Sequence, residues 1–110
     1  MVLLPQNAII AEEKLTKYLL VPLPKDDKSQ FLAKAGYTLA NWQQLEQDLR
    51  AQVLTQPAEQ IDTNRYGTKY AIHAQLCGAN GIELRIITIW MVANGTTKFV
   101  TLVPDKGANS

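Results

Sequence analysis

The sequence is poor in the residues from which metal and redox sites are built. Its 110 residues include one cysteine, Cys77, and one histidine, His73. An internal disulfide is therefore excluded, and a zinc site, which takes three or four Cys, His or carboxylate ligands, is not expected. Gly78 and Gly81 bracket a turn rather than a strand-to-helix crossover, so they do not form a phosphate-binding loop. We expect no metal and no cofactor.

The chain also lacks an excess of charge and a long apolar run. It has 11 Lys and Arg against 10 Asp and Glu, a formal net charge of +1, so no overall electrostatic field favours binding to nucleic acid or anionic lipid. No apolar run is long enough to span a membrane, and the opening MVLLPQNAII lacks the basic start of a signal peptide. Because a single cysteine suits a reducing compartment, we predict a cytoplasmic protein.

Two Asn-Gly pairs, Asn80-Gly81 and Asn94-Gly95, are the strongest structural signal that the sequence contains. Asn-Gly between β-rich runs favours a two-residue type I′ hairpin turn. The two pairs predict three antiparallel strands, at about 66–78, 82–93 and 97–103. The middle strand is apolar on both faces, as is typical of a central strand.

The first half of the chain has helical periodicity. Apolar residues recur three and four positions apart, which predicts helices at about 11–20, 27–35 and 42–55. Residues 57–65 are predicted to be a polar connector, and residues 2–4 could form a short strand that Pro5 stops.

The predicted second and third helices have recognisable ends. The charged cluster Lys25-Asp26-Asp27-Lys28 precedes the second helix, and either aspartate is available as its N-cap, while Gly36 suits the C′ position. Asn41 is the predicted cap of the third helix. Lysines at a helix start attract phosphate, but the two aspartates oppose an anion, so we favour a capped helix with solvated charges over an anion site.

These elements predict a single α+β domain over residues 1–110. The helical half covers about 11–56 and the β-meander about 66–104. Segregation of helices and strands along the chain is typical of this class. We expect about three helices packed on one face of a three- or four-stranded antiparallel meander.

The two turns also predict which side chains share a face of the sheet. Two-residue loops would pair residue 79 with 82 and residue 93 with 96. One face would be wholly apolar and would seat the helices: Tyr70, Ile72, Ala74, Leu76, Ile87, Ile89, Met91, Val100 and Leu102. The opposite face would be mixed, with the rows Ala71–Trp90–Phe99, His73–Thr88–Thr101 and Gln75–Ile86–Val103.

The mixed face is the predicted functional surface. An aromatic pair with polar neighbours, if exposed, usually marks a contact. The sequence leaves three alternatives open: cover by the N-terminal segment 2–10, a dimer or partner interface, and a substrate surface. The interface residues would be Trp90, Phe99, His73, Gln75 and Ala71.

His73 is the side chain expected to titrate near neutral pH. Beside Thr88 and Thr101 it could act as a general acid–base in RNA cleavage, with Arg85 or a lysine stabilising the phosphate. Arg85 has the opposite parity to His73 and should point to the other face, so we favour a histidine hydrogen-bonded across strands to a threonine. Cys77, near a strand end, is interpreted as a small packed hydrophobe.

The order of several short motifs resembles that of an uncharacterised bacterial family of domains of unknown function. The motifs are AIIAEEKLTKYLL, Lys28 and Phe31 leading to AGY, YGTKY, CGANG, ITIW and FVTLVP, and together they cover nearly the whole chain. The resemblance implies a small stand-alone protein beside another small protein, or a module at the end of toxin-like polypeptides. It therefore implies a toxin–antitoxin-like role, but it assigns no catalytic residues.

Our leading functional hypothesis is a non-enzymatic protein-interaction module, a homodimer or the partner of a neighbouring small protein. The alternative is a metal-independent ribonuclease of the toxin kind that uses His73. A nucleic-acid binder that stacks bases on Trp90 and Phe99 would need a basic groove, which the charge balance does not favour.

Overall fold

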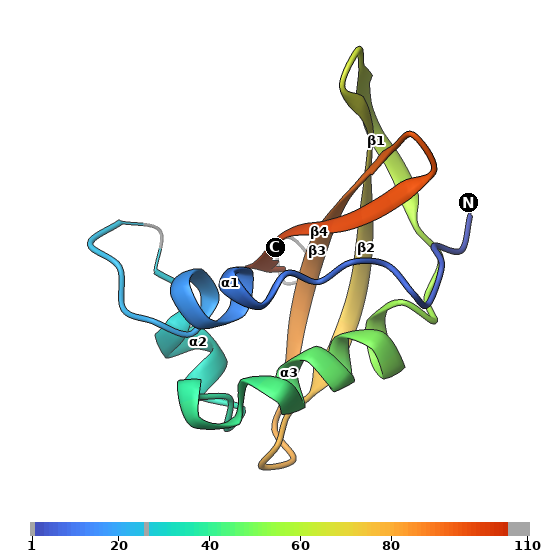
Figure 1. Cartoon of the computed structure of the whole chain (residues 1–110). Helices are drawn as coiled ribbons and strands as arrows, with labels where there is room; N and C mark the ends of the chain where they lie inside the picture. The colour runs from blue at the N-terminus through green and yellow to red at the C-terminus, as the bar shows by residue number, and fades with distance from the viewer. Residues whose placement is uncertain (1, 26, 106–110) are drawn as a thin grey trace.

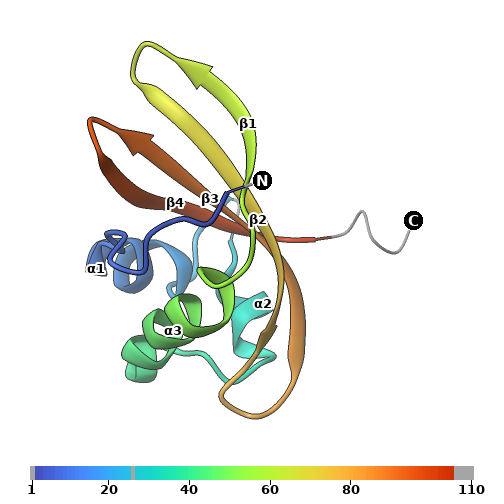
Figure 2. The same ribbon diagram turned by 90° about the vertical axis from the view of Figure 1, so that its right-hand side faces the viewer.

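A computed structural model, which describes residues 2–25 and 27–105, has the predicted α+β arrangement. Helical elements fill the first half of the described chain, and its strands form one antiparallel sheet in the order β1-β2-β3-β4. The helices lie on one face of this sheet, and none of the described helices lies on the other (Figures 1 and 2). The predicted fold class is therefore confirmed.

The three predicted helices are present, with irregular ends. In order, the helical elements are α1 (Glu12–Lys14), the π-helical turn η1 (Leu15–Leu19), α2 (Ser29–Ala33), the 3-10 turn η2 (Leu39–Asn41), α3 (Trp42–Asp48) and the π-helical turn η3 (Leu49–Val53). Their buried stripe consists of Leu15, Leu19, Leu32, Leu45, Leu49 and Val53. None of the described helices is long and apolar enough to cross a membrane.

The helix ends agree in part with the predicted caps. Gly36 follows α2 with φ of +86°, the left-handed conformation expected at C′. Asn41 stands at the start of α3 as predicted, but its side chain makes no capping bond there. It instead accepts the Thr38 N–H at 2.7 Å in a capping box that begins η2. Asp27 accepts the Ser29 hydroxyl at 2.8 Å, a bond that lowers the pKa of this carboxyl; Asp26 lies outside the described residues.

The sheet has one strand that the sequence did not predict. The strands are β1 (Glu59–Asn64), β2 (Gly67–Cys77), β3 (Glu83–Ala93) and β4 (Thr96–Pro104). β1 takes the place of the predicted polar connector. All six of its residues are exposed, so neither face of this strand is buried. Its sequence therefore lacks the alternation of apolar and polar side chains that predicts a half-buried strand.

The first Asn-Gly pair does not form the predicted two-residue turn. The Gly78 N–H donates to the Ile82 carbonyl at 2.9 Å, which leaves a three-residue loop, Ala79-Asn80-Gly81. Within it, the Gly81 N–H donates back to the Gly78 carbonyl at 3.0 Å, and Gly81 has φ of +87°. This is the three-residue hairpin in which a type I turn is followed by a left-handed residue.

The second Asn-Gly pair forms the predicted turn. Asn94 and Gly95 both have positive φ, 53° and 77°, and Ala93 pairs with Thr96. Two left-handed residues between paired strand ends are the hallmark of a type I′ turn. The same dipeptide therefore makes loops of two different lengths in one sheet.

The extra loop residue moves β3 one position out of its predicted register with β2. Tyr70 pairs with Trp90, and Cys77 pairs with Glu83. Trp90 pairs with Phe99 as predicted, but a β-bulge at Val100 shifts β4 beyond that point, because Ile89 pairs with Thr101. A one-residue slip turns every side chain of a strand to the other face, so the predicted faces are wrong for β3.

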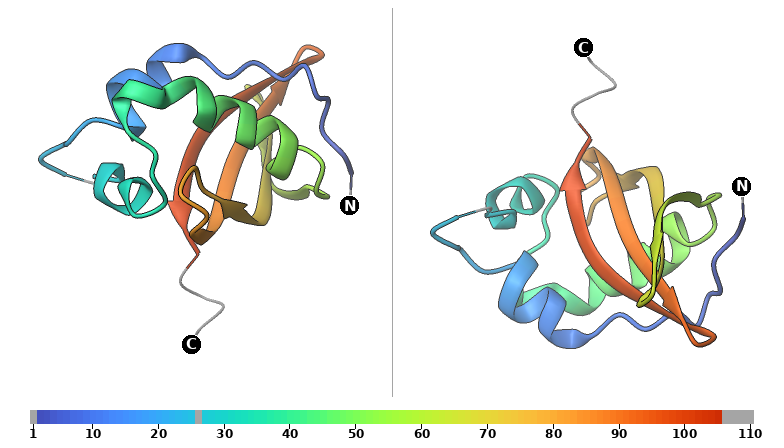
Figure 3. Two further views of the ribbon diagram at one scale, coloured as in Figure 1. Left: turned by 90° about the horizontal axis from the view of Figure 1, so that it is seen from below. Right: turned by 90° about the horizontal axis from the view of Figure 1, so that it is seen from above.

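The N-terminal segment, residues 2–10, joins both edges of the sheet. Val2 exchanges backbone hydrogen bonds of 3.1 and 2.6 Å with Ala58, just before β1. Ile9 exchanges bonds of 2.8 Å with Thr97 and Phe99 of β4. Figure 3 shows the segment running from α1 past the β3–β4 hairpin.

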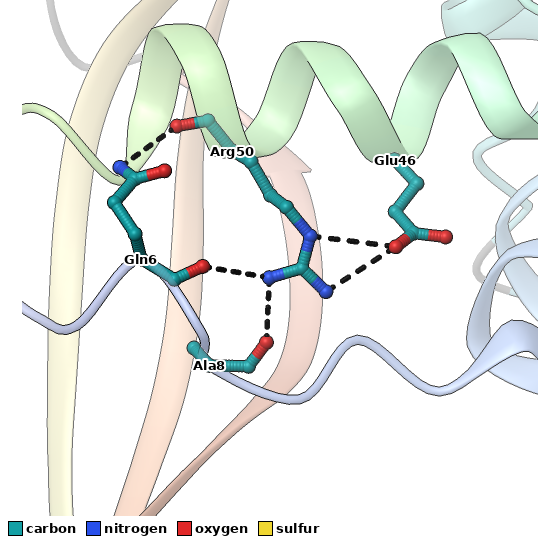
Figure 4. Close-up of polar contacts among 4 residues, drawn as sticks. All are labelled: Gln6, Ala8, Glu46 and Arg50. Atoms are coloured by element: carbon teal, nitrogen blue, oxygen red, sulfur yellow. Dashed lines mark hydrogen bonds and ion pairs between the residues drawn. The ribbon is translucent and has the colours of Figure 1, made fainter.

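Arg50 holds the middle of this segment against the helices. Its guanidinium donates to the carbonyls of Gln6 and Ala8 at 2.9 and 2.7 Å and pairs with Glu46 at 3.2 Å (Figure 4). The Gln6 amide returns a bond of 3.1 Å to the Arg50 carbonyl. The Arg50 side chain therefore holds residues 6–8 in place, where the segment belongs to no helix and pairs with no strand.

Candidate functional site

Trp90 and Phe99, the centre of the predicted interface, lie in the core. Trp90 is 0% exposed and Phe99 is 3% exposed. Their rings meet edge to face, with centroids 5.2 Å apart and planes at 73°. The prediction that the two rings lie on the sheet face opposite the helices is wrong, because the longer first loop turns Trp90 toward the helices.

The two predicted catalytic threonines have other partners. Thr88 is fully buried, and its hydroxyl accepts the Trp90 indole N–H at 2.7 Å. A buried indole needs such an acceptor, so Thr88 serves the core. The Thr101 hydroxyl lies 2.8 Å from the Tyr18 hydroxyl. The predicted row His73–Thr88–Thr101 is wrong, because His73 pairs with Ile87 and Thr88 with Leu102.

The sheet face that the described helices leave uncovered is built from the odd-numbered residues of β2 and β3 and their neighbours on β4. Five rows of side chains cross it, and we call them the open face. In order, the rows are Lys69–Met91–Lys98, Ala71–Ile89–Thr101, His73–Ile87–Val103, Gln75–Arg85–Asp105 and Cys77–Glu83. The first two rows continue onto β1, where Asp62 pairs with Lys69 and Glu59 pairs with Ala71. The middle rows are apolar on β3, and the last two rows carry Glu83, Arg85 and Asp105.

The open face keeps part of the predicted interface set. Ala71, His73 and Gln75 lie on it as predicted, although Ala71 is itself buried beside its neighbours. Its apolar centre is supplied by Ile87, Ile89 and Met91, which were assigned to the helix-covered face, and by Val103, which was assigned to the mixed face; all four are half-buried. The surface exists, but with different side chains at its centre.

One end of the open face brings His73, Arg85 and Asp105 together. His73 Nδ1 lies 3.4 Å from Asp105 Oδ2, and the Asp105 N–H donates to the Arg85 carbonyl at 2.9 Å. The prediction that His73 and Arg85 point to opposite faces is wrong, again because of the register slip. The three residues line a surface depression of about 480 Å³, with Gln52, Gln56, Ala74, Gln75, Cys77 and Glu83.

The electrostatics of this depression do not favour an anion. Arg85 is accompanied by two carboxylates, Glu83 and Asp105. An imidazole beside a carboxylate is an arrangement that can move protons. Cys77, an exposed thiol, stands four strand residues from His73, about 13 Å at 3.3 Å per residue, too far for a Cys–His nucleophile pair. Among the described residues, no three His, Cys, Asp or Glu side chains are grouped to hold a metal ion.

A second polar cluster involves the lysine at the start of α2. Lys28 Nζ donates to the Tyr18 hydroxyl at 2.9 Å and lies over its ring, as does Lys14. Burial would raise the pKa of Tyr18, but the bonds from Lys28 and Thr101 and the charges of both lysines together lower that pKa. Lys28 is therefore used inside the fold, in keeping with the preference for a capped helix over an anion site.

Sequence reasoning missed four residues of the depression, Gln52, Gln56, Glu83 and Asp105, and two of these contact β2 directly. Gln52 of η3 clamps the end of β2, because its side chain accepts the Cys77 N–H at 2.7 Å and donates to the Cys77 carbonyl at 3.0 Å. Asp105 reaches His73 from beyond the end of β4. Neither has a local signal in the sequence, since both positions depend on the register and on the bulge.

The chain as a whole matches one protein-family model. The model is described as Domain of unknown function (DUF6883) and matches residues 4–106. The chain belongs to this family, which confirms the resemblance in the motif order. No curated protein and no solved structure matches the chain.

Proposed function

We propose that this family member is a non-enzymatic protein-interaction module that binds through its open face. The observation that supports this most is the apolar centre of that face. Ile87, Ile89 and Met91 stand in three successive rows on β3, half-buried and beneath none of the described helices. Charged and polar side chains occupy both ends, and interfaces combine an apolar core with a polar rim in this way.

The pattern differs from that of an ordinary solvated sheet face. An antiparallel sheet with one face in water usually alternates apolar and polar side chains, so that the wet face is polar. β3 is apolar toward the helices and also at the centre of its other face. Isolated exposed residues such as Ile61 and Ile82 need no explanation, whereas a contiguous apolar group does.

The partner would be a second copy of the chain or a small neighbouring protein. A bacterial, cytoplasmic, toxin–antitoxin-like setting remains a prediction that accompanies this proposal. It motivates one specific candidate, the product of the adjacent gene.

The test compares two isoleucine-to-glutamate variants. We expect wild-type protein to bind itself in sedimentation velocity, or the adjacent gene's product in titration calorimetry, and Ile89→Glu to lose that binding. Ile82→Glu is the matched control, because Ile82 is exposed outside the open face and should retain it. Association that survives Ile89→Glu unchanged would exclude the open face as the binding surface.

A second candidate is the metal-independent ribonuclease, and one observation favours it. His73 Nδ1 lies 3.4 Å from Asp105 Oδ2, and Arg85 lines the same depression, which supports this candidate because an imidazole, a carboxylate and a cation lie together. Thr88 has no part in this version, since it is buried. Purified protein should then cut RNA in the presence of a chelator, and His73→Ala should reduce the rate by 10²-fold or more. RNA left intact by wild-type protein would remove this candidate.

A further inference from the structure

We propose that Asn94 is a site of spontaneous covalent modification, at which the side-chain amide is converted to a carboxylate, and that the fold protects Asn80 from the same reaction. The two asparagines stand in identical Ala-Asn-Gly triplets, and both are exposed. Their loops lie at opposite ends of β3 (Figure 1). Neither the triplet nor solvent exposure distinguishes the two sites, so the difference must come from the hydrogen bonds of the two loops.

The reaction needs only the asparagine, the glycine that follows it and water. A base in solvent removes the proton of the glycine N–H, and the nitrogen attacks the asparagine Cγ. The Cγ–Nδ2 bond breaks, ammonia leaves, and a succinimide ring remains. Water then opens the ring at one of its two carbonyl carbons, which gives aspartate or, where the main chain now passes through Cγ, isoaspartate. Glycine favours the attack because it has no Cβ to crowd the ring.

The first loop holds each group that would have to react. Asn80 Nδ2 donates to the Lys34 carbonyl at 3.1 Å, and Asn80 Oδ1 accepts the Ile82 N–H at 3.0 Å. The Gly81 N–H, which carries the attacking nitrogen, donates to the Gly78 carbonyl at 3.0 Å. Both the amide that would leave and the nitrogen that would attack are therefore engaged elsewhere.

The first loop is also fastened to the segment that follows α2. The Asn80 N–H donates to the Ala35 carbonyl at 3.2 Å, in addition to the side-chain bond to Lys34. For Cγ to reach the Gly81 nitrogen, the Asn80 side chain must leave its partners and the Gly81 N–H must leave its acceptor. The reaction at Asn80 then proceeds only through a local opening of the loop, which is a minor population of the folded state.

The second loop holds neither group. It is closed by the pairing of Ala93 with Thr96, on either side of the turn. Within the part of the chain that the structure describes, neither the Asn94 side chain nor the Gly95 N–H has a hydrogen-bond partner. The amide and the nitrogen are both in contact with water, so their approach breaks no bond within the protein.

The modification changes the charge and the backbone at the tip of the β3–β4 hairpin. Loss of the amide lowers the formal net charge by one unit from +1. Asn94 lines a depression of about 480 Å³ with Ile9, Met91 and Lys98, so the new carboxylate enters a site that already holds a cation. Isoaspartate also adds one main-chain atom to a two-residue loop, which the type I′ geometry does not accommodate.

The two sites are compared in one sample of the wild-type protein. The folded chain is incubated at mildly alkaline pH in water enriched in heavy oxygen, and cleavage after Arg85 separates the two asparagines for mass spectrometry. We expect Asn94 to gain oxygen at least about tenfold faster than Asn80, since several bonds must open together at Asn80. In urea that unfolds the chain, the two rates should agree within about threefold, because the triplets are identical.

Asn94→Gly is the control variant, because Gly-Gly also suits a type I′ turn. It should keep the circular dichroism spectrum of the wild type and lose the fast reaction, while the rate at Asn80 stays unchanged. Equal rates at the two sites of the folded chain, or a faster rate at Asn80, overturn the proposal. So does an Asn94 that stays intact in the folded chain while the unfolded chain is converted. A tenfold difference that persists in urea would overturn the assigned cause, since it would then arise from the sequence.

Discussion

The two faces of the sheet are both apolar at their centres and differ in what meets the apolar side chains. On the covered face, Trp90 is enclosed by Phe99 and the helices, and Thr88 satisfies its indole N–H. On the open face, Ile87 and Ile89 remain half-buried between charged ends. Apolar character alone therefore does not distinguish a core face from the proposed binding face. The polar surroundings do: a buried acceptor marks the first, and charged rows mark the second.

Removing the central ring of the covered face should have the largest effect. We expect Trp90→Ala to lower the free energy of unfolding by about 3–5 kcal/mol, because it removes a fully buried aromatic side chain and leaves Thr88 without its donor. Urea denaturation measures the change. Ile89→Ala, the matched truncation on the open face, should cost about 1 kcal/mol, and equal losses from the two variants would contradict the difference between the faces.

A methyl group at the end of the first hairpin should be the next most disruptive change. A Cβ on Gly78 would clash with the carbonyl oxygen and the Cβ of Ala35. Backbone cannot yield as a side chain can, so we expect Gly78→Ala to cost about 3 kcal/mol.

Gly81→Ala provides the control for this change. It meets no atom within 4 Å and carries only the strain of φ +87°, so it should cost about 1 kcal/mol. Thermal unfolding of both variants would rank them. The opposite rank would show that the loop does not pack on α2 as described.

Loss of the Arg50 side-chain contacts should weaken the pairing of the N-terminal segment, residues 2–10, with the edge strand β4. Arg50→Met keeps much of the aliphatic volume but loses the bonds to Gln6 and Ala8, for an expected loss of about 1–2 kcal/mol at this half-buried site. Hydrogen exchange at the Phe99 amide, which bonds to Ile9, should quicken. Glu46→Gln removes only the half-exposed ion pair and should change stability by less than about 0.5 kcal/mol. Equal effects would show that the carbonyl bonds do not hold the segment.

The Tyr37 hydroxyl contacts both Asp48 of α3 and the Cys77 carbonyl of β2, and it should make the free energy of unfolding fall at alkaline pH. Burial, followed by the hydrogen bond to Asp48, raises the pKa of Tyr37 far above its ordinary value. An unfolded tyrosine ionises near pH 10, so its contribution is complete below that pH and is lost as pH rises further, by up to about 1.4 kcal/mol per pH unit. Tyr37→Phe should flatten the slope of unfolding free energy between pH 10 and 11; an unchanged slope would assign the loss to other groups.

Much of this fold follows from local patterns. The leucine stripes located the three helices, Gly36 ended one of them, and Asn94-Gly95 set the β3–β4 hairpin. These features depend on residues a few positions apart, which a sequence displays directly. The proposed binding surface depends instead on which strand residues pair, and pairing is not local.

The first Asn-Gly pair shows why the pairing was mispredicted. Asn80 and Gly81 fit a type I′ turn as well as Asn94 and Gly95 do, but Asn80 also donates to the Lys34 carbonyl, and its N–H bonds to the Ala35 carbonyl. Contacts with α2 thus accompany the longer loop. The extra residue in that loop shifts the pairing of β3 with β2 by one position. Ile89 therefore faces away from the helices in place of Trp90, and Arg85 lies on the same face as His73. β1 and the bulge at Val100 were missed for the same reason, since only the neighbouring strand reveals them.

The central claim, that one sheet has a core face and a binding face, is tested most directly by a single variant measured in two ways. Ile87→Glu changes the middle row of the open face, and its unfolding free energy and association constant can be measured on the same sample. We expect stability to fall by about 1 kcal/mol or less, as for a half-exposed strand position, while association weakens by a hundredfold or more. A loss of 3 kcal/mol with association unchanged would contradict the account, because Ile87 would then belong to the core.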